Sequence, residues 1–362
     1  MGKCRICKKE DKTASSFLSL CAKCIKENFS QLKDDLINLH KKIKERFGIF
    51  YQEKKQGVGC SLCINQCRLK EKEISFCGLR EAKDNQLVGP DKNFANLDYY
   101  FDSLPTNCVV SFCCAAAGFG FSKFSYTEKE EQGYKNLAVF FGACSFNCLF
   151  CQNYSYHWRT KNKNLISLEE LLEIIDEKTS CVCFFGGDPS THIDFTINFS
   201  YQAIKSKKNR ILRICWETNG SFNPYYQKDI LGILLKTGRT IKFDLKFYSP
   251  QINFALCGSF NKLTLENFSF FAKNFPLRKK PALVCASTLV ILGYIDEEEI
   301  EKLSFFISKF DEEIPYSLLG FSPQFYFEDL PPTSWDLMKR CYNTAKKFLK
   351  NVNMANLHLF SS

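Results

Sequence analysis

The sequence predicts an α/β protein built on a parallel sheet and preceded by a cysteine-rich, metal-binding region. From about residue 137, apolar strand-like runs alternate with helical stretches. Cysteines at short, regular spacings fill the first 80 residues, and one more such group follows the first predicted strand. Alternating strands and helices imply a parallel sheet that is either an incomplete barrel or doubly wound, and in both folds the site lies at the strands' carboxyl ends.

Composition excludes several classes of protein. The chain has 362 residues, of which 45% are hydrophobic and 36 are phenylalanine, so it can bury a large core. No apolar run reaches the ~18 residues of a membrane span, and the lysine-rich N-terminus is not a signal sequence. We therefore expect a cytoplasmic protein with no membrane partner. Its 20 cysteines then indicate metal sites rather than disulfides.

Positive charge is concentrated at the N-terminus. The formal net charge is +10, and residues 1–56 hold 14 Lys or Arg against 7 Asp or Glu, a net of +7. Such a region can meet an acidic protein or a nucleic acid, although a solvated lysine-rich face is the commoner explanation.

The first predicted module covers residues 1–50. Cys4-x2-Cys7 and Cys21-x2-Cys24 are separated by thirteen residues, a spacing typical of a zinc knuckle. An amphipathic helix follows, because apolar residues recur every three or four positions up to Gly48. These residues are Phe29, Leu32, Leu36, Leu39, Ile43 and Phe47.

A second cysteine group defines a predicted extension over residues 51–130. Cys60-x2-Cys63-x3-Cys67 is followed by Cys77, and these four residues could close around one zinc ion or carry an auxiliary iron–sulfur cluster. The sequence does not separate these alternatives. Buried, unreactive thiols are the simplest interpretation of three further cysteines, Cys108, Cys113 and Cys114, while Cys181, Cys183 and Cys257 receive no role.

The third predicted unit, residues 131–362, holds the sheet and ends in a helix and a strand. Three of its helices have recognisable starts: Ser167 with Glu170, near Asp296 with Glu299, and Thr333 with Asp336. Six strands are expected, at residues 137–142, 181–185, 211–216, 240–247, 282–292 and 315–321.

Three cysteines follow the first of these strands as Cys144-x3-Cys148-x2-Cys151, with Phe150 just before the last. Three thiolates so close together can bind an iron–sulfur cluster and leave one iron open, whereas a structural site normally takes four protein ligands. The alternative is a structural zinc completed by a distant cysteine such as Cys181 or Cys183.

Polar motifs end the next two strands. A Gly-Gly turn lets the backbone approach a ligand and its following carboxylate can accept an ammonium group, although such turns are also ordinary chain reversals. The next strand ends in polar residues that can hydrogen-bond a ribose, or that simply cap a turn. The candidate residues are Gly186, Gly187 and Asp188, then Glu217, Thr218 and Asn219.

Asp244 and Lys246 lie in the fourth predicted strand. Residues two apart in a strand share one face, so the acid and the base point together toward the expected site. A buried ion pair is costly unless it has a use, but a salt bridge inside the barrel is a serious alternative.

Taken in order, these motifs resemble radical S-adenosylmethionine (SAM) enzymes of the pyruvate formate-lyase activating enzyme type, and most closely the AmmeMemoRadiSam branch. The resemblance spans roughly residues 57 to 360 and leaves out the Cys4–Cys24 knuckle. It is carried by Cys60-Ser-Leu-Cys63-Ile-Asn-Gln-Cys67, Cys77-Gly78-Leu79-Arg80, Cys144 to Cys151 with Gln152-Asn153, Asp244-Leu245-Lys246, Leu256-Cys257-Gly258, and Thr288 to Gly293.

The resemblance implies a partial (βα)6 TIM-like barrel and a [4Fe-4S] cluster on Cys144, Cys148 and Cys151. The open iron would chelate SAM, whose reductive cleavage yields a 5′-deoxyadenosyl radical that takes hydrogen from a substrate. Ferredoxin or flavodoxin would donate the electron, and the substrate is a macromolecule, a protein sooner than RNA. The residues implied to contact SAM are Phe150, Gly186, Gly187, Asp188, Glu217, Thr218, Asn219, Asp244, Lys246 and Gly293.

Two departures from the family pattern stand out. Related enzymes place extra clusters between the core motif and the Gly-Gly turn, yet only 34 residues separate Cys151 from Gly186. The segment around Gly293 lacks the usual proline and asparagine. Two alternatives stay open: a methylation, cross-link or nucleoside modification by the same core, and a binding protein whose cysteine groups hold only zinc.

Overall fold

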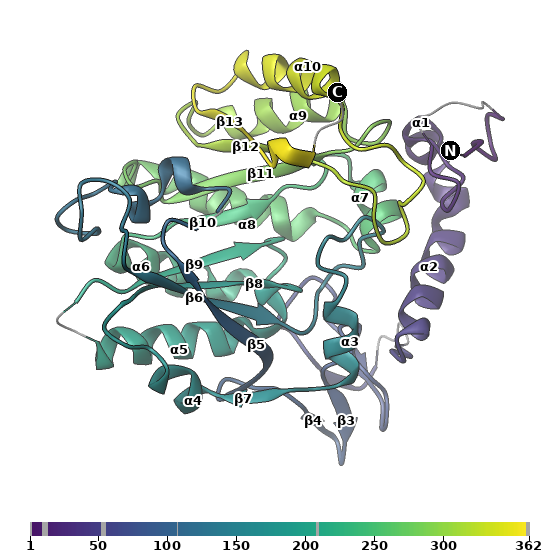
Figure 1. The fold of residues 1–362 in the computed structure, drawn as a ribbon. Helices are drawn as coiled ribbons and strands as arrows, with labels where there is room; N and C mark the ends of the chain where they lie inside the picture. Colours follow the sequence, from purple (N-terminus) through teal and green to yellow (C-terminus); the bar gives the residue numbers. More distant parts are fainter. Residues whose placement is uncertain (1, 9–13, 52–55, 107, 208–209, 360–362) are drawn as a thin grey trace.

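A computed structural model describes residues 2–8, 14–51, 56–106, 108–207 and 210–359. It contains a nine-stranded central sheet in the order β13-β12-β11-β10-β9-β8-β6-β5-β7 (Figure 1). This confirms the expected α/β class. The strands are β5 (Phe94–Ser103), β6 (Lys135–Phe141), β7 (Leu165–Ser167), β8 (Thr179–Gly186), β9 (Arg213–Thr218), β10 (Ile241–Asp244), β11 (Val284–Val290), β12 (Tyr316–Gly320) and β13 (Val352–Ala355).

Strand order distinguishes the two predicted architectures. Apart from β7, the strands from β6 to β13 are parallel and lie side by side in chain order, with no reversal at which a doubly wound sheet would switch direction. Strands β13 and β7 stand at the two edges, so the sheet does not close. The arrangement is an incomplete barrel, to which β5 adds an antiparallel strand beside β6 that the sequence analysis did not anticipate.

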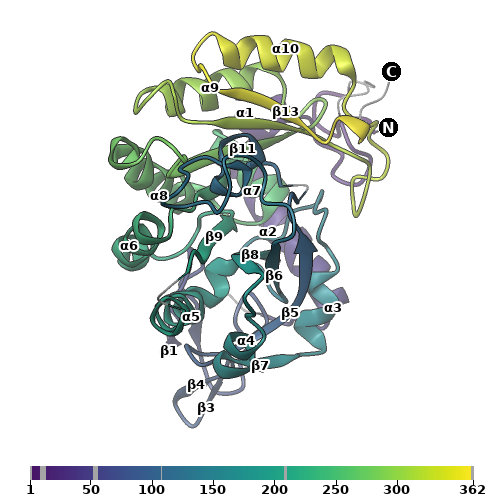
Figure 2. The same cartoon turned by 60° about the vertical axis from the view of Figure 1, so that its left-hand side comes forward.

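Helices follow the strands and cover the sheet. In Figure 2, α5, α6 and α8 run along one side, while α9 and α10 cover the end that holds β13. Their bounds are α3 (Tyr156–Lys161), α4 (Leu168–Glu173), α5 (Ile193–Ser206), α6 (Gln227–Thr237), α7 (Pro250–Cys257), α8 (Lys262–Lys273), α9 (Glu297–Ser308) and α10 (Trp335–Lys346). No helix in the described part of the chain is both long and apolar enough to cross a bilayer.

Two of the three predicted helix starts are confirmed. Ser167 and Glu170 form a reciprocal capping box at α4, and Asp296 caps α9. The third was wrong by one residue, since Ser334 caps α10. Thr333 is committed elsewhere, because its hydroxyl donates to the Val290 carbonyl and accepts from the Phe321 amide, both at 2.7 Å.

The predicted amphipathic helix is confirmed as α2 (Phe29–Arg46), preceded by α1 (Ala22–Glu27). Its apolar stripe is buried against the barrel, and two polar residues of α2, His40 and Lys44, are buried with it. His40 docks the helix on the cysteine loop: its carbonyl accepts from Asn147 Nδ2 at 3.1 Å and its Nε2 lies 3.1 Å from the Ala255 carbonyl.

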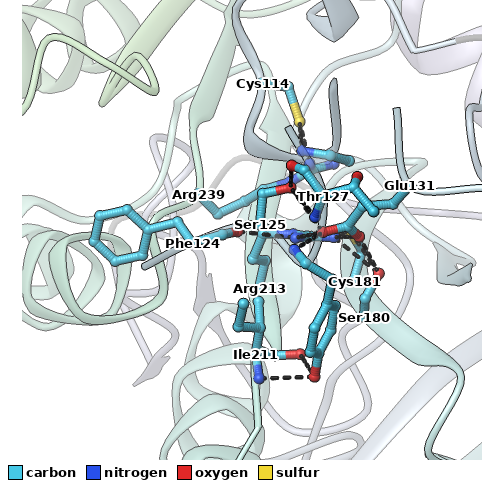
Figure 3. A network of polar contacts seen from close by, with 12 residues as sticks. Cys114, Phe124, Ser125, Thr127, Glu131, Ser180, Cys181, Ile211, Arg213 and Arg239 are labelled. Carbon is cyan, nitrogen blue, oxygen red and sulfur yellow. Dashed lines mark hydrogen bonds and ion pairs between the residues drawn. The ribbon is translucent and has the colours of Figure 1, made fainter. Parts of the chain in front are cut away.

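A buried ion pair braces the amino ends of the strands (Figure 3). Arg213 and Glu131 have fully buried side chains and are joined by two contacts, one of them 2.6 Å long. Glu131 also accepts from Ser180 at 2.9 Å, and Arg213 donates to the Phe124 carbonyl at 2.9 Å. The network therefore ties the loop before β6 to the starts of β8 and β9, at the end of the sheet opposite the predicted site.

Candidate functional site

A pocket of about 230 Å³ lies at the carboxyl ends of the parallel strands. Cys144, Cys148 and Cys151 all contribute to its lining. Because β6, β8, β9 and β10 are parallel, the segments that follow them meet at this one edge. The predicted residues gathered there are Cys144, Cys148, Phe150, Cys151, Gly186, Gly187, Asp188, Glu217, Asn219, Asp244 and Lys246.

The loop that carries the three cysteines is held by backbone hydrogen bonds to the end of α7. The amides of Asn147 and Leu149 donate to the carbonyls of Cys257 and Leu256, at 2.7 and 2.9 Å. Burial raises the pKa of the Cys144 thiol, and it raises that of Cys151 to about 12. These two thiols therefore carry negative charge readily only when a metal group compensates it. Burial acts to raise the pKa of Cys148 as well, but its hydrogen bond with Cys257 opposes burial and the pKa is lowered overall. Three cysteines in one pocket fit an iron–sulfur cluster.

Cys257, to which the sequence assigned no role, lies beside this group. It is fully buried at the end of α7, and its thiol hydrogen-bonds with that of Cys148. It does not line the pocket. The pocket therefore presents three cysteines to a cluster, with a fourth thiol behind them.

The Gly-Gly-Asp turn is shaped by close backbone contacts. Gly186 has φ +104°, and a Cβ at Gly187 would collide with the Ala143 carbonyl, so neither position tolerates a side chain. The Asp188 carboxylate accepts from the amides of Ser190 and Asn219, at 2.7 and 2.6 Å. Burial raises the pKa of Asp188 to about 6, despite these hydrogen bonds.

Thr218 and Gly293 do not line the pocket in the part of the chain that is described. The Thr218 hydroxyl donates to the Asp188 carboxylate at 3.1 Å, so Thr218 supports Asp188 rather than facing the pocket. Gly293 lies in the turn between Ile291 and Ile295, with φ +79°, and it is Ile295 that reaches the pocket.

Asp244 stands at the centre of a charged group on the pocket wall. Lys242 Nζ lies 2.9 Å from Asp244 and 3.0 Å from Glu217, whereas Lys246 Nζ is 3.5 Å from Asp244. Burial raises the pKa of Asp244, but Lys242 and Lys246 outweigh it and leave this carboxyl with a pKa well below its usual range. The sequence analysis missed Lys242, although it lies two residues from Asp244, as Lys246 does, and so shares the same face of the strand.

Further lining residues also escaped prediction. Ser287, in β11, donates to Asp244 at 2.8 Å, and several apolar side chains complete the wall. The apolar set is Val109, Leu289, Ile295 and Leu319. Leu289 belongs to the Thr288 to Gly293 segment that the resemblance marks, whereas no motif marks Val109, Ser287 or Leu319, because each looks like an ordinary core position.

A second pocket adjoins the first through Glu217, which lines both. Cys108 and Cys183 line it, and their thiols lie 3.4 and 3.8 Å from Glu217 Oε1. Cys108 is only half-buried, so it differs from the inert, buried thiol expected from the sequence, whereas Cys113 and Cys114 are buried. Arg239 also lines this pocket.

The N-terminal quartet Cys4, Cys7, Cys21 and Cys24 converges to one point. Its four sulfur atoms all lie within 4.8 Å of one another. Tetrahedral zinc with Zn–S bonds of about 2.3 Å separates its sulfurs by about 3.8 Å. This quartet therefore fits one metal ion whose four ligands are all cysteines. None of the four lines the pocket described above.

Comparison with known proteins bears on the family to which part of this chain is similar. Residues 138–307 match the Radical SAM superfamily. A protein of Methanocaldococcus jannaschii named "Putative glycyl-radical enzyme activating enzyme" is 26% identical over 220 residues, covering 58% of this chain and 76% of its own length.

Solved structures with a similar fold include a domain of pyruvate-formate lyase-activating enzyme from Bacteroides vulgatus, at 16% identity and a TM-score of 0.38, over 48% of this chain and 98% of that one. Another is SuiB of Streptococcus suis bound to the precursor peptide SuiA, at 19% identity and a TM-score of 0.46, over 60% and 47%. The family match, together with the barrel strands and the cysteine loop that it covers, identifies residues 138–307 as a radical SAM domain.

Proposed function

We propose that the protein is a radical SAM enzyme whose [4Fe-4S] cluster is held by Cys144, Cys148 and Cys151. The observation that carries this proposal is the pocket in which these three thiols meet the polar ends of the neighbouring strands. When bound, the cluster supplies the electron that cleaves SAM to methionine and a 5′-deoxyadenosyl radical, which abstracts hydrogen from a substrate.

The side chains around the pocket have separate tasks in this proposal. Asp188 joins the Gly-Gly turn to the Asn219 turn, so that both present a fixed edge to the methionyl end of SAM. Asp244, kept ionised by its two lysines, offers a carboxylate to the ribose or to the sulfonium. The apolar residues Leu289, Ile295 and Leu319 suit the adenine and exclude water from a reactive radical.

We propose that the second pocket binds the substrate. It shares Glu217 with the SAM pocket, so a group bound there lies beside the adenosyl moiety. We propose a protein substrate, as the name of the M. jannaschii relative suggests for that enzyme, and ferredoxin or flavodoxin as the one-electron donor.

Reconstitution tests the proposal. Protein loaded with iron and sulfide under anoxic conditions, given SAM and dithionite, should form 5′-deoxyadenosine, measured by chromatography. Protein that binds zinc stoichiometrically but takes up no cluster, and that forms no 5′-deoxyadenosine, would instead be a metal-stabilised binding protein.

Asp244→Asn should weaken SAM binding about 10- to 100-fold, because hydrogen bonds to charged groups contribute about 1.5–3 kcal/mol. The change removes the negative charge and leaves Lys242 and Lys246 facing the sulfonium cation. Calorimetric titration of the anoxic protein with SAM measures the effect. Asp229→Asn, on α6 and outside the pocket, is the control. Equal affinity in both variants would remove Asp244 from the SAM site.

Cys4→Ala should cost about 3 kcal/mol or more of unfolding free energy, because we propose that the quartet binds a structural zinc ion that stabilises the fold. The variant should lose zinc in elemental analysis while 5′-deoxyadenosine formation stays measurable. Cys341→Ala, in α10 and outside the metal groups, is the matched control. If Cys4→Ala keeps its zinc, the quartet is not the zinc site.

A further inference from the structure

Beyond the SAM site, we propose that Cys60, Cys63, Cys67 and Cys77 bind a second [4Fe-4S] cluster rather than zinc, and that Lys44 is a counter-charge placed between this cluster and the first. This goes beyond the proposed function, because the second cluster can be present whether or not the first one cleaves SAM.

The four cysteines come together through one hairpin and the turn that follows it. Strands β1 (Val58–Gly59) and β2 (Arg68–Leu69) pair, and the Cys60 amide donates to the Cys67 carbonyl at 2.8 Å. Cys63 lies in the connecting loop, and Cys77 lies in the turn before β3 (Glu81–Lys83). Cys60, Cys63 and Cys77 are buried and Cys67 is half-buried, and the Phe76 amide donates to Cys67 Sγ, which brings Cys67 beside Cys77.

Spacing separates the two metal types. Among the described residues, only the N-terminal quartet has three or more ligand atoms within 4.8 Å of one another. The second quartet does not reach that spacing, and neither does the Cys144–Cys151 trio. In a four-iron cluster each thiolate binds a different iron, so the sulfurs stand farther apart than around one zinc ion. Neither the second quartet nor the trio is therefore gathered as tightly as the N-terminal quartet, which fits one zinc ion.

Two buried, positively charged side chains near these thiols have a nitrogen atom with no hydrogen-bond partner among the described residues. Lys44 Nζ has no hydrogen-bond partner among the described residues, although its side chain is fully buried. It lies 4.2 Å from the centre of the Phe76 ring, and the Phe76 amide donates to Cys67 Sγ at 3.4 Å. Arg80 Nη2 is likewise buried and unpartnered. An unpaired buried cation is costly, and a cluster with net negative charge would compensate both.

Lys44 also faces the first cluster's ligands. Burial lowers the pKa of Lys44 to about 8, and the thiolates that oppose this shift are Cys144 and Cys148 of the trio together with Cys77 and Cys67 of the second quartet. One turn earlier on α2, His40 docks on Asn147 within the trio's loop. A single ammonium group thus lies between the two sets of thiols.

The two loops touch directly. Asn65, two residues after Cys63, donates from Nδ2 to the Ser145 carbonyl at 2.8 Å, and Ser145 follows Cys144. Ser259 bridges the same pair, with its hydroxyl 3.3 Å from Asn65 Oδ1 and 3.2 Å from the Ser145 carbonyl. Reduction of either cluster adds negative charge, so the lysine between them stabilises the reduced form of both.

Metal analysis of the full-length protein decides between the alternatives without any substitution. After anoxic reconstitution we expect eight irons and one zinc per chain, because three cysteine groups would hold two four-iron clusters and one zinc ion. Four irons and two zincs would overturn the second cluster.

A triple variant, Cys144→Ala/Cys148→Ala/Cys151→Ala, separates this proposal from the SAM chemistry. It should form no 5′-deoxyadenosine yet keep four irons, with the absorbance and electron paramagnetic resonance signals of a [4Fe-4S] cluster. Adding Cys63→Ala should remove those irons. Iron absent from the triple variant would refute the second cluster, whereas iron present in it and no SAM cleavage by the native protein would refute only the proposed function.

Lys44→Met tests the counter-charge by potentiometry. Its clusters should have more negative midpoint potentials than those of the native protein, while Lys44→Arg, which keeps the charge, should stay close to the native values. Unchanged potentials in Lys44→Met, with full iron content, would remove Lys44 from this role.

Discussion

Cys148→Ser should reduce 5′-deoxyadenosine formation to below about one per cent of the native rate, because losing a cluster ligand should exceed the 10- to 100-fold effect typical of groups that only orient ligands. The Cys148 thiol lines the pocket. Chromatography of anoxic reactions with dithionite measures the product, and iron analysis measures cluster content.

Cys257→Ser provides a demanding control. Its thiol contacts that of Cys148 and is as deeply buried, yet it stays outside the pocket. It should therefore retain the cluster and most of the activity. If Cys257→Ser loses the cluster as Cys148→Ser does, then four thiolates surround it, no iron is open to SAM, and the proposed chemistry fails.

Glu131→Ala should lower the free energy of unfolding by about 3–5 kcal/mol, the usual cost of removing one partner of a buried ion pair. Arg213 would keep its charge in a fully buried position with its carboxylate gone (Figure 3). Burial raises the pKa of Glu131, but the hydrogen bond and charge of Arg213 outweigh burial, so its pKa is lowered. The pair therefore stabilises the fold above about pH 4.3, the unfolded value, and loses this effect as pH falls further.

Chemical denaturation at pH 7 and at pH 4 measures both effects. Glu130→Ala, at the adjacent exposed position, should change stability little. The difference between Glu131→Ala and the native protein should shrink at pH 4, because Glu131 of the unfolded chain then binds a proton that the folded ion pair, with its lowered pKa, disfavours. Equal stability of the two alanine variants at pH 7 would show that the ion pair contributes nothing.

Much of the barrel was predictable because its strands are apolar on both faces and are bounded by capped helices. All six expected strands are present, and the three cysteines and the polar strand ends do meet at one pocket. Strand β5 was missed because its sequence, Phe94 to Ser103, mixes acidic and exposed aromatic residues and lacks a clean alternation.

Other parts of the site depend on contacts between distant segments, which local patterns do not encode. Cys257 comes to Cys148 only because α7 docks on the cysteine loop, and Lys44 is indistinguishable in sequence from the exposed lysines of the same helix. The two N-terminal quartets have similar short spacings in sequence, and only the folded structure shows that the sulfurs of Cys4, Cys7, Cys21 and Cys24 lie within 4.8 Å of one another.

The docking of α2 has a consequence for biosynthesis. Its buried His40 contacts Asn147 and Ala255, which leave the ribosome more than a hundred residues later. During translation this helix is therefore synthesised early but can pack in its final position only after most of the barrel has emerged. Until then the back of the cysteine loop stays uncovered, which leaves an interval in which iron delivery and chain completion overlap.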